Sequence, residues 1–195
     1  SFFKANVVDI ELLMDNAMLA LNYQQAAKYG LKYILFGYNM ATEGMNIPPG
    51  WNHYKYDVYN IRKIHKRFGN VPIKTHPLFS TIDSLKYSYI NRIKGISFLD
   101  YFPYNKFEAL EVLEKEFGYK PYPYKHYESV FTRFYQGYIL PRKFGYDKRR
   151  VHLSTLVVSG QMDREDALKL LEESPYPDPA QEERDRIFVM EKLGF

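Results

Sequence analysis

The chain has 195 residues, no cysteine and a formal net charge of +4 at pH 7. This length suffices for one large domain or two small ones with a buried core, and the lack of cysteine excludes disulfides, thiolate zinc sites and cysteine nucleophiles within it. There is no apolar run long enough to span a membrane and no basic–apolar signal at the start, so we expect no membrane partner and a cytoplasmic location.

The first part of the chain predicts a helix, a strand and a polar loop. Between Val7 and Tyr29, apolar residues recur at intervals of three and four, as in a helix with one buried face. That face would consist of Val7, Ile10, Met14, Ala17 and Leu21. The apolar run Lys32–Gly37 predicts a short, buried parallel strand. The polar segment Tyr38–Gly44 would then lie at the carboxyl end of this strand, where open α/β sheets bind ligands.

A loop, a helix and a second strand are predicted next. Asn46–Tyr56 contains Pro-Pro-Gly and is expected to be a loop. Asp57–Phe68 has the pattern of an amphipathic helix, and Val71–Lys74 is a candidate second strand. Since two strands do not make a stable parallel sheet, either this chain contains further strands that the pattern does not reveal, or the remaining strands belong to residues that precede Ser1.

The remainder of the chain is predicted to be mostly helical. Asn105 is a candidate N-cap, and Pro179 is expected at the first position of the last helix. The predicted helices are Leu85–Ile96, Asn105–Phe117, Glu128–Leu140 and Lys148–Ser159, with two more that begin at Asp163 and Asp178.

Positive charge is concentrated in Ser129–Met162, which holds six Lys or Arg residues and one acid. Aromatic residues alternate with these basic residues, and guanidinium forks beside rings suit the recognition of phosphate or carboxylate. We therefore predict an anion-binding pocket in this stretch. Two alternatives are a solvated basic face and pairing with the acidic segment Asp163–Phe195.

Candidate site residues fall in two groups. In the loop after the first strand, Gly37 would let the backbone approach a ligand, Asn39 and Thr42 would donate or accept hydrogen bonds, and Glu43 would either hold Mg²⁺ or orient a nucleophile. The alternative is an ordinary loop in which Asn39 or Thr42 caps a helix. The candidate substrate-binding residues are Arg133, Tyr135, Arg142, Lys143, Lys148, Arg149, Arg150 and His152. No catalytic residue is evident, and the five histidines are too widely spaced to indicate a metal site.

Several segments together resemble the N-acetyl sugar amidotransferase family of PP-loop ATP pyrophosphatases. The resemblance extends in order through nearly the whole chain, and its longest segment is the most specific. The main matching segments are FGYNMATEG (Phe36–Gly44), DVYNIRKIHKRFG (Asp57–Gly69), IKTHP (Ile73–Pro77), ESVFTRFYQGYILPRKFGYDKRR (Glu128–Arg150) and SGQMDREDAL (Ser159–Leu168).

This resemblance implies an α/β fold and a reaction. Residues 1–77 would belong to an adenine-nucleotide α-hydrolase (PP-loop, Rossmann-like) domain, and residues 78–195 would form a mostly helical substrate or partner region. With ATP and Mg²⁺ as cofactors, such an enzyme converts an acetamido group of a nucleotide-linked N-acetyl sugar to an acetamidino group, for bacterial surface polysaccharide such as lipopolysaccharide O-antigen. A partner glutaminase with a cyclase-like subunit supplies the ammonia.

The same resemblance places Asn39, Thr42 and Glu43 at the nucleotide. The family's pyrophosphate-binding loop, SGGxDS, is absent from these residues, so we expect the chain to correspond to the C-terminal part of such an enzyme.

Two other functions remain open. Basic residues interleaved with aromatic residues are also typical of RNA-binding modules, and some PP-loop relatives modify transfer RNA. The modest net charge argues against a nucleic-acid partner. The other hypothesis is a non-catalytic interaction domain that docks on a partner through Asp163–Phe195.

Overall fold

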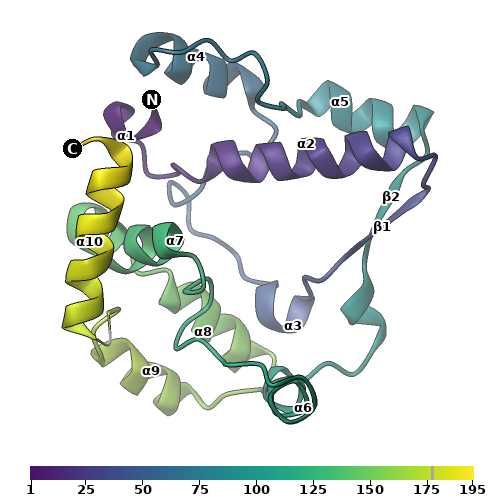
Figure 1. Cartoon of the computed structure of the whole chain (residues 1–195). Helices are drawn as coiled ribbons and strands as arrows, with labels where there is room; N and C mark the ends of the chain where they lie inside the picture. Colours follow the sequence, from purple (N-terminus) through teal and green to yellow (C-terminus); the bar gives the residue numbers. More distant parts are fainter. Residues whose placement is uncertain (177) are drawn as a thin grey trace. The chain divides into compact units, whose positions relative to one another are not determined.

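The structure is a computed structural model that describes residues 1–176 and 178–195 (Figure 1). The chain divides into two compact units. Unit 1 comprises Ser1–Gly37 and Ile47–Phe98, and unit 2 comprises Tyr38–Asn46 and Leu99–Phe195. The division after residue 77, which follows the sequence resemblance, stays a prediction, as does the PP-loop, Rossmann-like fold.

Unit 1 contains helices and a two-stranded parallel sheet. Its elements are α1 (Phe2–Ala5), α2 (Leu12–Lys28), β1 (Tyr33–Phe36), α4 (Val58–Phe68), α5 (Thr81–Leu85), the π-helix η1 (Lys86–Ile90) and β2 (Lys94–Ser97). The strands pair in parallel, with Tyr33 opposite Lys94 and Phe36 opposite Ser97.

A buried amide organises the core of unit 1. The Asn16 side chain on α2 is fully buried, and its Nδ2 donates to the carbonyl oxygens of Lys55 at 2.7 Å and Phe79 at 2.8 Å. The Phe79 N–H donates to Asn16 Oδ1 at 3.0 Å. The Phe79 ring lies among three tyrosine rings, those of Tyr23, Tyr56 and Tyr87. A loop far along the chain is thereby fixed on α2.

The predicted helix near the N-terminus is confirmed, but its predicted buried face is wrong. The helix α2 begins at Leu12, and Met14 and Leu21 are about half exposed. The buried positions on the helix are instead Leu12, Asn16, Ala20 and Ala26. Apolar periodicity does not reveal this face because Asn16, one of its central residues, has a polar side chain.

The first predicted strand is confirmed as β1, but it is not buried, since Tyr33 and Leu35 are each 61% exposed. The second predicted strand, Val71–Lys74, is wrong, and that segment has no regular structure. Pro72 has no N–H to contribute to a ladder. The partner strand β2 comes from the end of the predicted helix Leu85–Ile96, which stops at Ile90 before the left-handed residue Arg92 (φ 56°).

Unit 2 is helical. Its elements are α3 (Met40–Glu43), α6 (Lys106–Phe117), α7 (Val130–Phe134), the π-helix η3 (Tyr135–Phe144), α8 (Arg149–Val158), α9 (Arg164–Glu172) and α10 (Pro179–Leu193), and the 3₁₀ helix η2 (Phe98–Tyr101) leads into it. Within unit 2, α10 packs on α7, and α8 packs on both α3 and α9 (Figure 1).

Most of the predicted C-terminal helices are confirmed with their caps. The Asn105 side chain accepts a hydrogen bond from the Phe107 N–H at 2.9 Å, and α6 ends at left-handed Gly118. Pro179 begins α10, as predicted. Among the described residues, no helix is both long enough and apolar enough to cross a bilayer.

The helix predicted to end at Leu140 continues for another turn. Residues Tyr135–Phe144 form the π-helix η3, which passes through Pro141 and ends at left-handed Gly145. Proline lacks the N–H that an α-helical hydrogen bond requires, and its ring crowds the preceding turn. The wider π-helical turn accommodates Pro141, so the chain remains helical there.

Candidate functional site

The segment predicted to contact a nucleotide forms the start of unit 2. Asn39 is buried and caps α3, because its Oδ1 accepts hydrogen bonds from the Thr42 N–H at 2.9 Å and from Thr42 Oγ1 at 3.2 Å. The alternative of a helix capped by Asn39 is therefore what the structure shows. The Met40 N–H donates to Asp100 Oδ1 at 2.7 Å. Gly37 closes unit 1, whereas Asn39, Thr42 and Glu43 belong to unit 2.

Glu43, at the end of α3, forms an ion pair that the sequence did not suggest. Its Oε1 lies 2.6 Å from Lys125 Nζ, and both side chains are partly exposed. A carboxylate that already neutralises an ammonium group is a poor ligand for a metal ion. Among the described residues, no group of three or more His, Asp or Glu side chains could hold a metal. Binding of Mg²⁺ through Glu43 therefore stays a prediction.

Lys125 belongs to a group of basic side chains that we call the lysine–histidine cluster. The His126 and His152 rings are 5.7 Å apart, edge to face. His152 on α8 lies one helical turn after Lys148, the N-cap residue of this helix, and the backbone N–H of His152 donates to the Lys148 carbonyl at 3.3 Å. The cluster consists of Lys106, Lys125, His126, Lys148 and His152, all from unit 2.

Lys106 enters the cluster from the first position of α6. The Gln161 side chain fixes this end of the helix, because its Oε1 accepts from the Lys106 N–H at 2.9 Å. Its Nε2 donates to the Tyr104 carbonyl at 3.0 Å. One glutamine thus joins the segment after α8 to the start of α6, which positions Lys106.

The members of the cluster influence one another's pKa values. Burial and, to a smaller extent, the positive charges of Lys125, His126, Lys148 and Lys106 together lower the pKa of His152 to about 3. Burial and the charge of Lys125 also lower the pKa of Lys106. At neutral pH the His152 imidazole is therefore uncharged, and it lies among ammonium groups that repel one another.

Two carboxylates lie at the edge of the cluster. Glu43 pairs with Lys125, and Glu128 Oε1 lies 4.0 Å from His126 Nδ1. Burial and the negative charge of Glu43 raise the pKa of Tyr104. With three ammonium groups against two carboxylates, these groups together remain positive at neutral pH. This arrangement favours an anion.

Of the predicted substrate-binding arginines, two are paired with the acidic segment. Arg133 forms an ion pair with Asp185 on α10, and Arg142 NH2 lies 2.7 Å from Glu182 Oε1 on the same helix. Arg142 also lies over the Tyr138 ring, 4.1 Å from its centroid. The structure shows, for these two guanidinium groups, the alternative of pairing with Asp163–Phe195.

Arg149 is buried and belongs to the framework of unit 2. Its NH2 lies 2.8 Å from Asp147 Oδ2, and it donates to the carbonyl oxygens of Leu170 and Glu173, each at 3.0 Å through NH1 and NH2 respectively. A single side chain therefore links the turn before α8 to the end of α9. Its donors are satisfied within the protein.

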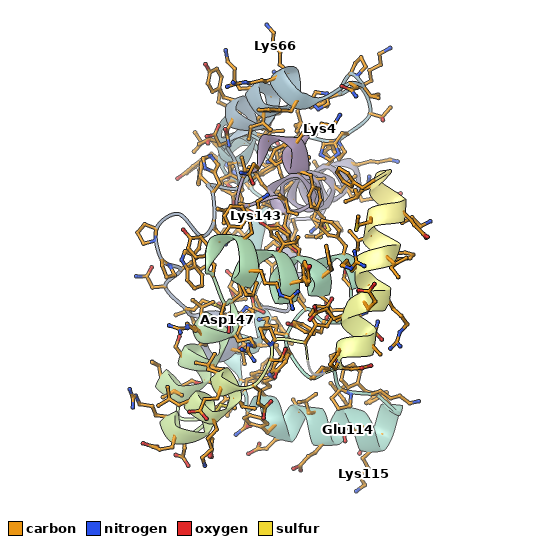
Figure 2. All side chains as sticks on the ribbon, turned by 90° about the vertical axis from the view of Figure 1, so that its left-hand side faces the viewer. Lys4, Lys66, Glu114, Lys115, Lys143 and Asp147 are labelled. Atoms are coloured by element: carbon orange, nitrogen blue, oxygen red, sulfur yellow. The ribbon has the colours of Figure 1, made fainter. Side chains whose placement is uncertain are left out.

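The other predicted residues are dispersed. Tyr135 is 2% exposed, with its ring stacked on Phe131. Lys143 is exposed at the end of η3, with its Nζ 5.6 Å from the centroid of the Phe144 ring (Figure 2). Arg150 is exposed. The structure thus brings together Lys148, His152 and the Glu43 segment, and it leaves ligand binding by the remaining candidates as a prediction.

Lys106, Lys125 and His126 were not among the site residues predicted from the sequence. Lys125 ends the Lys-Pro-Tyr-Pro-Tyr-Lys segment, His126 follows it directly, and Lys106 opens a predicted helix. None of these three residues stands out in the sequence. His126 has a left-handed backbone, φ 68°, which is uncommon for a residue other than glycine, but no local pattern announces it.

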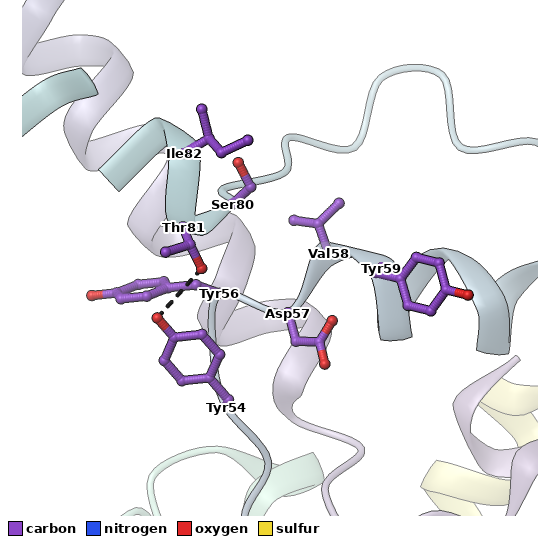
Figure 3. A pocket seen from close by; sticks show the side chains of 8 residues that line it. All are labelled: Tyr54, Tyr56, Asp57, Val58, Tyr59, Ser80, Thr81 and Ile82. Atoms are coloured by element: carbon purple, nitrogen blue, oxygen red, sulfur yellow. Dashed lines mark hydrogen bonds between the residues drawn. The ribbon is translucent and has the colours of Figure 1, made fainter. Parts of the chain in front are cut away.

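Unit 1 contains a pocket of about 280 Å³ beside the start of α4 (Figure 3). It is lined by Tyr54, Tyr56, Asp57, Val58, Tyr59, Ser80, Thr81 and Ile82. Its polar groups are used within the fold: Asp57 accepts from the Asn60 N–H at 2.8 Å, and Ser80 Oγ donates to Asp83 at 2.6 Å. The pocket thus offers mainly tyrosine rings, and no predicted site residue lines it.

Part of the chain matches a known protein family. The family described as LPS biosynthesis protein WbpG-like, C-terminal domain, matches residues 128–195. This segment runs from the residues before α7 to the end of the chain and contains Lys148 and His152. No curated protein and no solved structure matches the chain. Residues 128–195 are therefore similar to the C-terminal region of an LPS biosynthesis family.

Proposed function

We propose that the protein acts in lipopolysaccharide biosynthesis as an ATP-dependent amidotransferase. Its substrate is a nucleotide-linked N-acetyl sugar, whose acetamido group becomes an acetamidino group. The match of residues 128–195 supports the process, and the segments that resemble the amidotransferase family support the reaction.

One structural observation carries the proposal. The helix α3, which lies within the FGYNMATEG segment, packs on α8, which lies within the matched region. Glu43 of the first segment and His152 of the second both border the same lysine–histidine cluster. A segment expected at a nucleotide thus lies beside a positively charged group of side chains, as phosphate-bearing substrates require.

The reaction requires activation of an unreactive amide. Transfer of the adenylyl group of ATP to the acetamido oxygen releases pyrophosphate and makes the carbon electrophilic. Ammonia then attacks this carbon, and AMP leaves with the oxygen. We propose that the lysine–histidine cluster binds phosphates of these substrates and that a glutaminase with a cyclase-like subunit delivers the ammonia.

The test is a reconstituted reaction with the product of the complete reading frame. The enzyme is incubated with ATP, Mg²⁺, a nucleotide-linked N-acetyl sugar and isotopically labelled ammonium chloride, which replaces the glutaminase. We expect AMP and pyrophosphate in equal amounts and a sugar product with one labelled nitrogen in place of an oxygen. A folded enzyme that forms no labelled product with any such sugar would refute the proposal.

The two alternatives predict different results. An RNA-binding protein would retain transfer RNA on a filter, with an affinity that falls steeply as salt rises. An interaction domain would bind a partner only while residues 163–195 are present, and it would form no AMP. Either result without sugar-dependent AMP formation would replace the amidotransferase proposal.

A further inference from the structure

We propose that the lysine–histidine cluster is a phosphate-binding site and that Glu43 is its internal counter-ion, which an incoming phosphate displaces from Lys125. The inference rests on the proposed function only for the identity of the ligand. The geometry of the cluster supports the existence of the site independently of that function.

The cluster is assembled from segments far apart in the sequence. Lys106 comes from the start of α6, Lys125 and His126 come from the segment before α7, Lys148 is the N-cap residue of α8, and His152 lies within α8. A solvated surface would let such side chains diverge, whereas here the two imidazole rings are in contact and an ammonium group is fixed against Glu43. Convergence of like charges costs free energy, which a bound anion offsets.

Glu43 occupies the place that a ligand oxygen would take. Its carboxylate is 2.6 Å from Lys125 Nζ, a distance typical of a charge-assisted hydrogen bond. With 36% of its side chain exposed, Glu43 can move into solvent without unfolding α3. A phosphate, with more charge and more acceptor oxygens than a carboxylate, can contact several members of the cluster together.

One buried polar group on α8 lacks a hydrogen-bond partner in the described part of the chain. Thr155 is 6% exposed, and its buried Oγ1 has no hydrogen-bond partner among the described residues. Lys148, His152 and Thr155 follow one another at intervals of four and three, so they share a face of the helix. An unpaired buried hydroxyl is uncommon and indicates a missing partner, and this one lies one turn beyond His152.

Two sources of phosphate fit this chemistry, namely ATP and the diphosphate of a nucleotide-linked sugar. The test is therefore a set of calorimetric titrations of the full chain with pyrophosphate, ATP and a uridine-diphosphate-linked N-acetyl sugar. We expect pyrophosphate to bind, with an affinity that falls as salt rises. Of the other two ligands, the one that binds more tightly identifies the source.

Variants separate this site from nonspecific attraction. Lys106→Gln and Lys148→Gln should each weaken pyrophosphate binding about tenfold or more, because each removes a charge-assisted contact. Glu43→Gln should strengthen binding severalfold, because it removes the competing carboxylate. Lys115→Gln, on the exposed side of α6, is the matched control and should have no effect (Figure 2).

Equal losses in Lys106→Gln, Lys148→Gln and Lys115→Gln, or no gain in Glu43→Gln, would overturn the proposal. Should a variant unfold, the wild-type chain still decides the matter, since pyrophosphate should shift the NMR signals of the His126 and His152 rings and leave those of His65 in place. Because these measurements require no turnover, an inactive enzyme that binds pyrophosphate here refutes the proposed function alone.

Discussion

Arg133 and Asp185 join the basic stretch of this chain to its acidic C-terminal segment through two hydrogen bonds. Arg133 Nε lies 2.5 Å from Asp185 Oδ2, and NH2 lies 2.9 Å from Oδ1. Asp185 is 2% exposed, and it also accepts hydrogen bonds from the Tyr176 hydroxyl at 2.8 Å and from Gln181 Nε2 at 2.6 Å. The pair links α7 to α10. Opposite charges of the basic stretch and the acidic C-terminal segment therefore stabilise the fold here.

Substitution of Arg133 by Ala should destabilise unit 2. It leaves the buried carboxylate of Asp185 without its cation, which typically costs about 3–5 kcal/mol in the free energy of unfolding. Urea unfolding followed by circular dichroism measures the loss. The control is Arg184→Ala, whose exposed pair with Asp178 should contribute about 1 kcal/mol or less. Equal effects of the two variants would contradict a structural role for the Arg133 pair.

Adjacent arginines on α8 should behave differently. Arg149→Ala removes the buried partner of Asp147 and leaves carbonyl groups at the end of α9 unpaired, so we expect a loss of about 3 kcal/mol or more. Arg150→Ala, at an exposed position, should change stability by about 0.5 kcal/mol or less. Thermal unfolding of both variants checks this, and a comparable loss in Arg150→Ala would show that the burial of Arg149 is not decisive.

In unit 1, the expected weak point is the Asn16 amide. Asn16→Leu removes three hydrogen bonds and leaves the N–H and C=O of Phe79 without this partner, which should lower the free energy of unfolding by about 2–4 kcal/mol. Asn22→Leu makes the same chemical change on an exposed position of α2 and should be nearly neutral. If Asn16→Leu is as stable as Asn22→Leu, the amide does not fix the Phe79 loop.

Local signals were sufficient to predict much of the secondary structure. The cap at Asn105 and the proline at position 179 identify helix starts because they act on the backbone beside them. The partner of β1 was missed because Lys94–Ser97 follows a helical segment closely and contains Gly95, so its short strand has no apolar alternation. The strand β2 forms because it pairs with β1, a segment far away in the sequence.

The candidate site shows the same limit. Lys148 and His152 were predicted because they lie in a conspicuous basic stretch, whereas Lys106 and Lys125 become part of the site only through tertiary packing. Arg133 and Arg149 were predicted to bind substrate for the same compositional reason. The sequence contains no feature that distinguishes an arginine paired with Asp185 or Asp147 from one that is available to a ligand.

The remaining prediction concerns the pH dependence of stability. The pKa of His152 is lowered to about 3 by burial and by Lys125, His126, Lys148 and Lys106, which surround it with positive charge. In the unfolded chain it titrates near about 6.5. Between these values the unfolded state binds more protons, so the free energy of unfolding should fall as pH decreases below about 6.5, by at most about 1.4 kcal/mol per pH unit and less because His152 is partly solvated.

Urea unfolding at a series of pH values between about 7 and 4 tests this pH dependence. His152→Asn removes the titrating group and should flatten the decline, whereas the exposed control Lys115→Gln should keep the wild-type slope. Saturating pyrophosphate should also reduce the slope, because a bound anion compensates the positive charge around His152 and raises its pKa toward the ordinary value. Superimposable curves for wild type and His152→Asn would show that His152 does not lie in a strongly positive environment. The phosphate site would then lose its electrostatic basis.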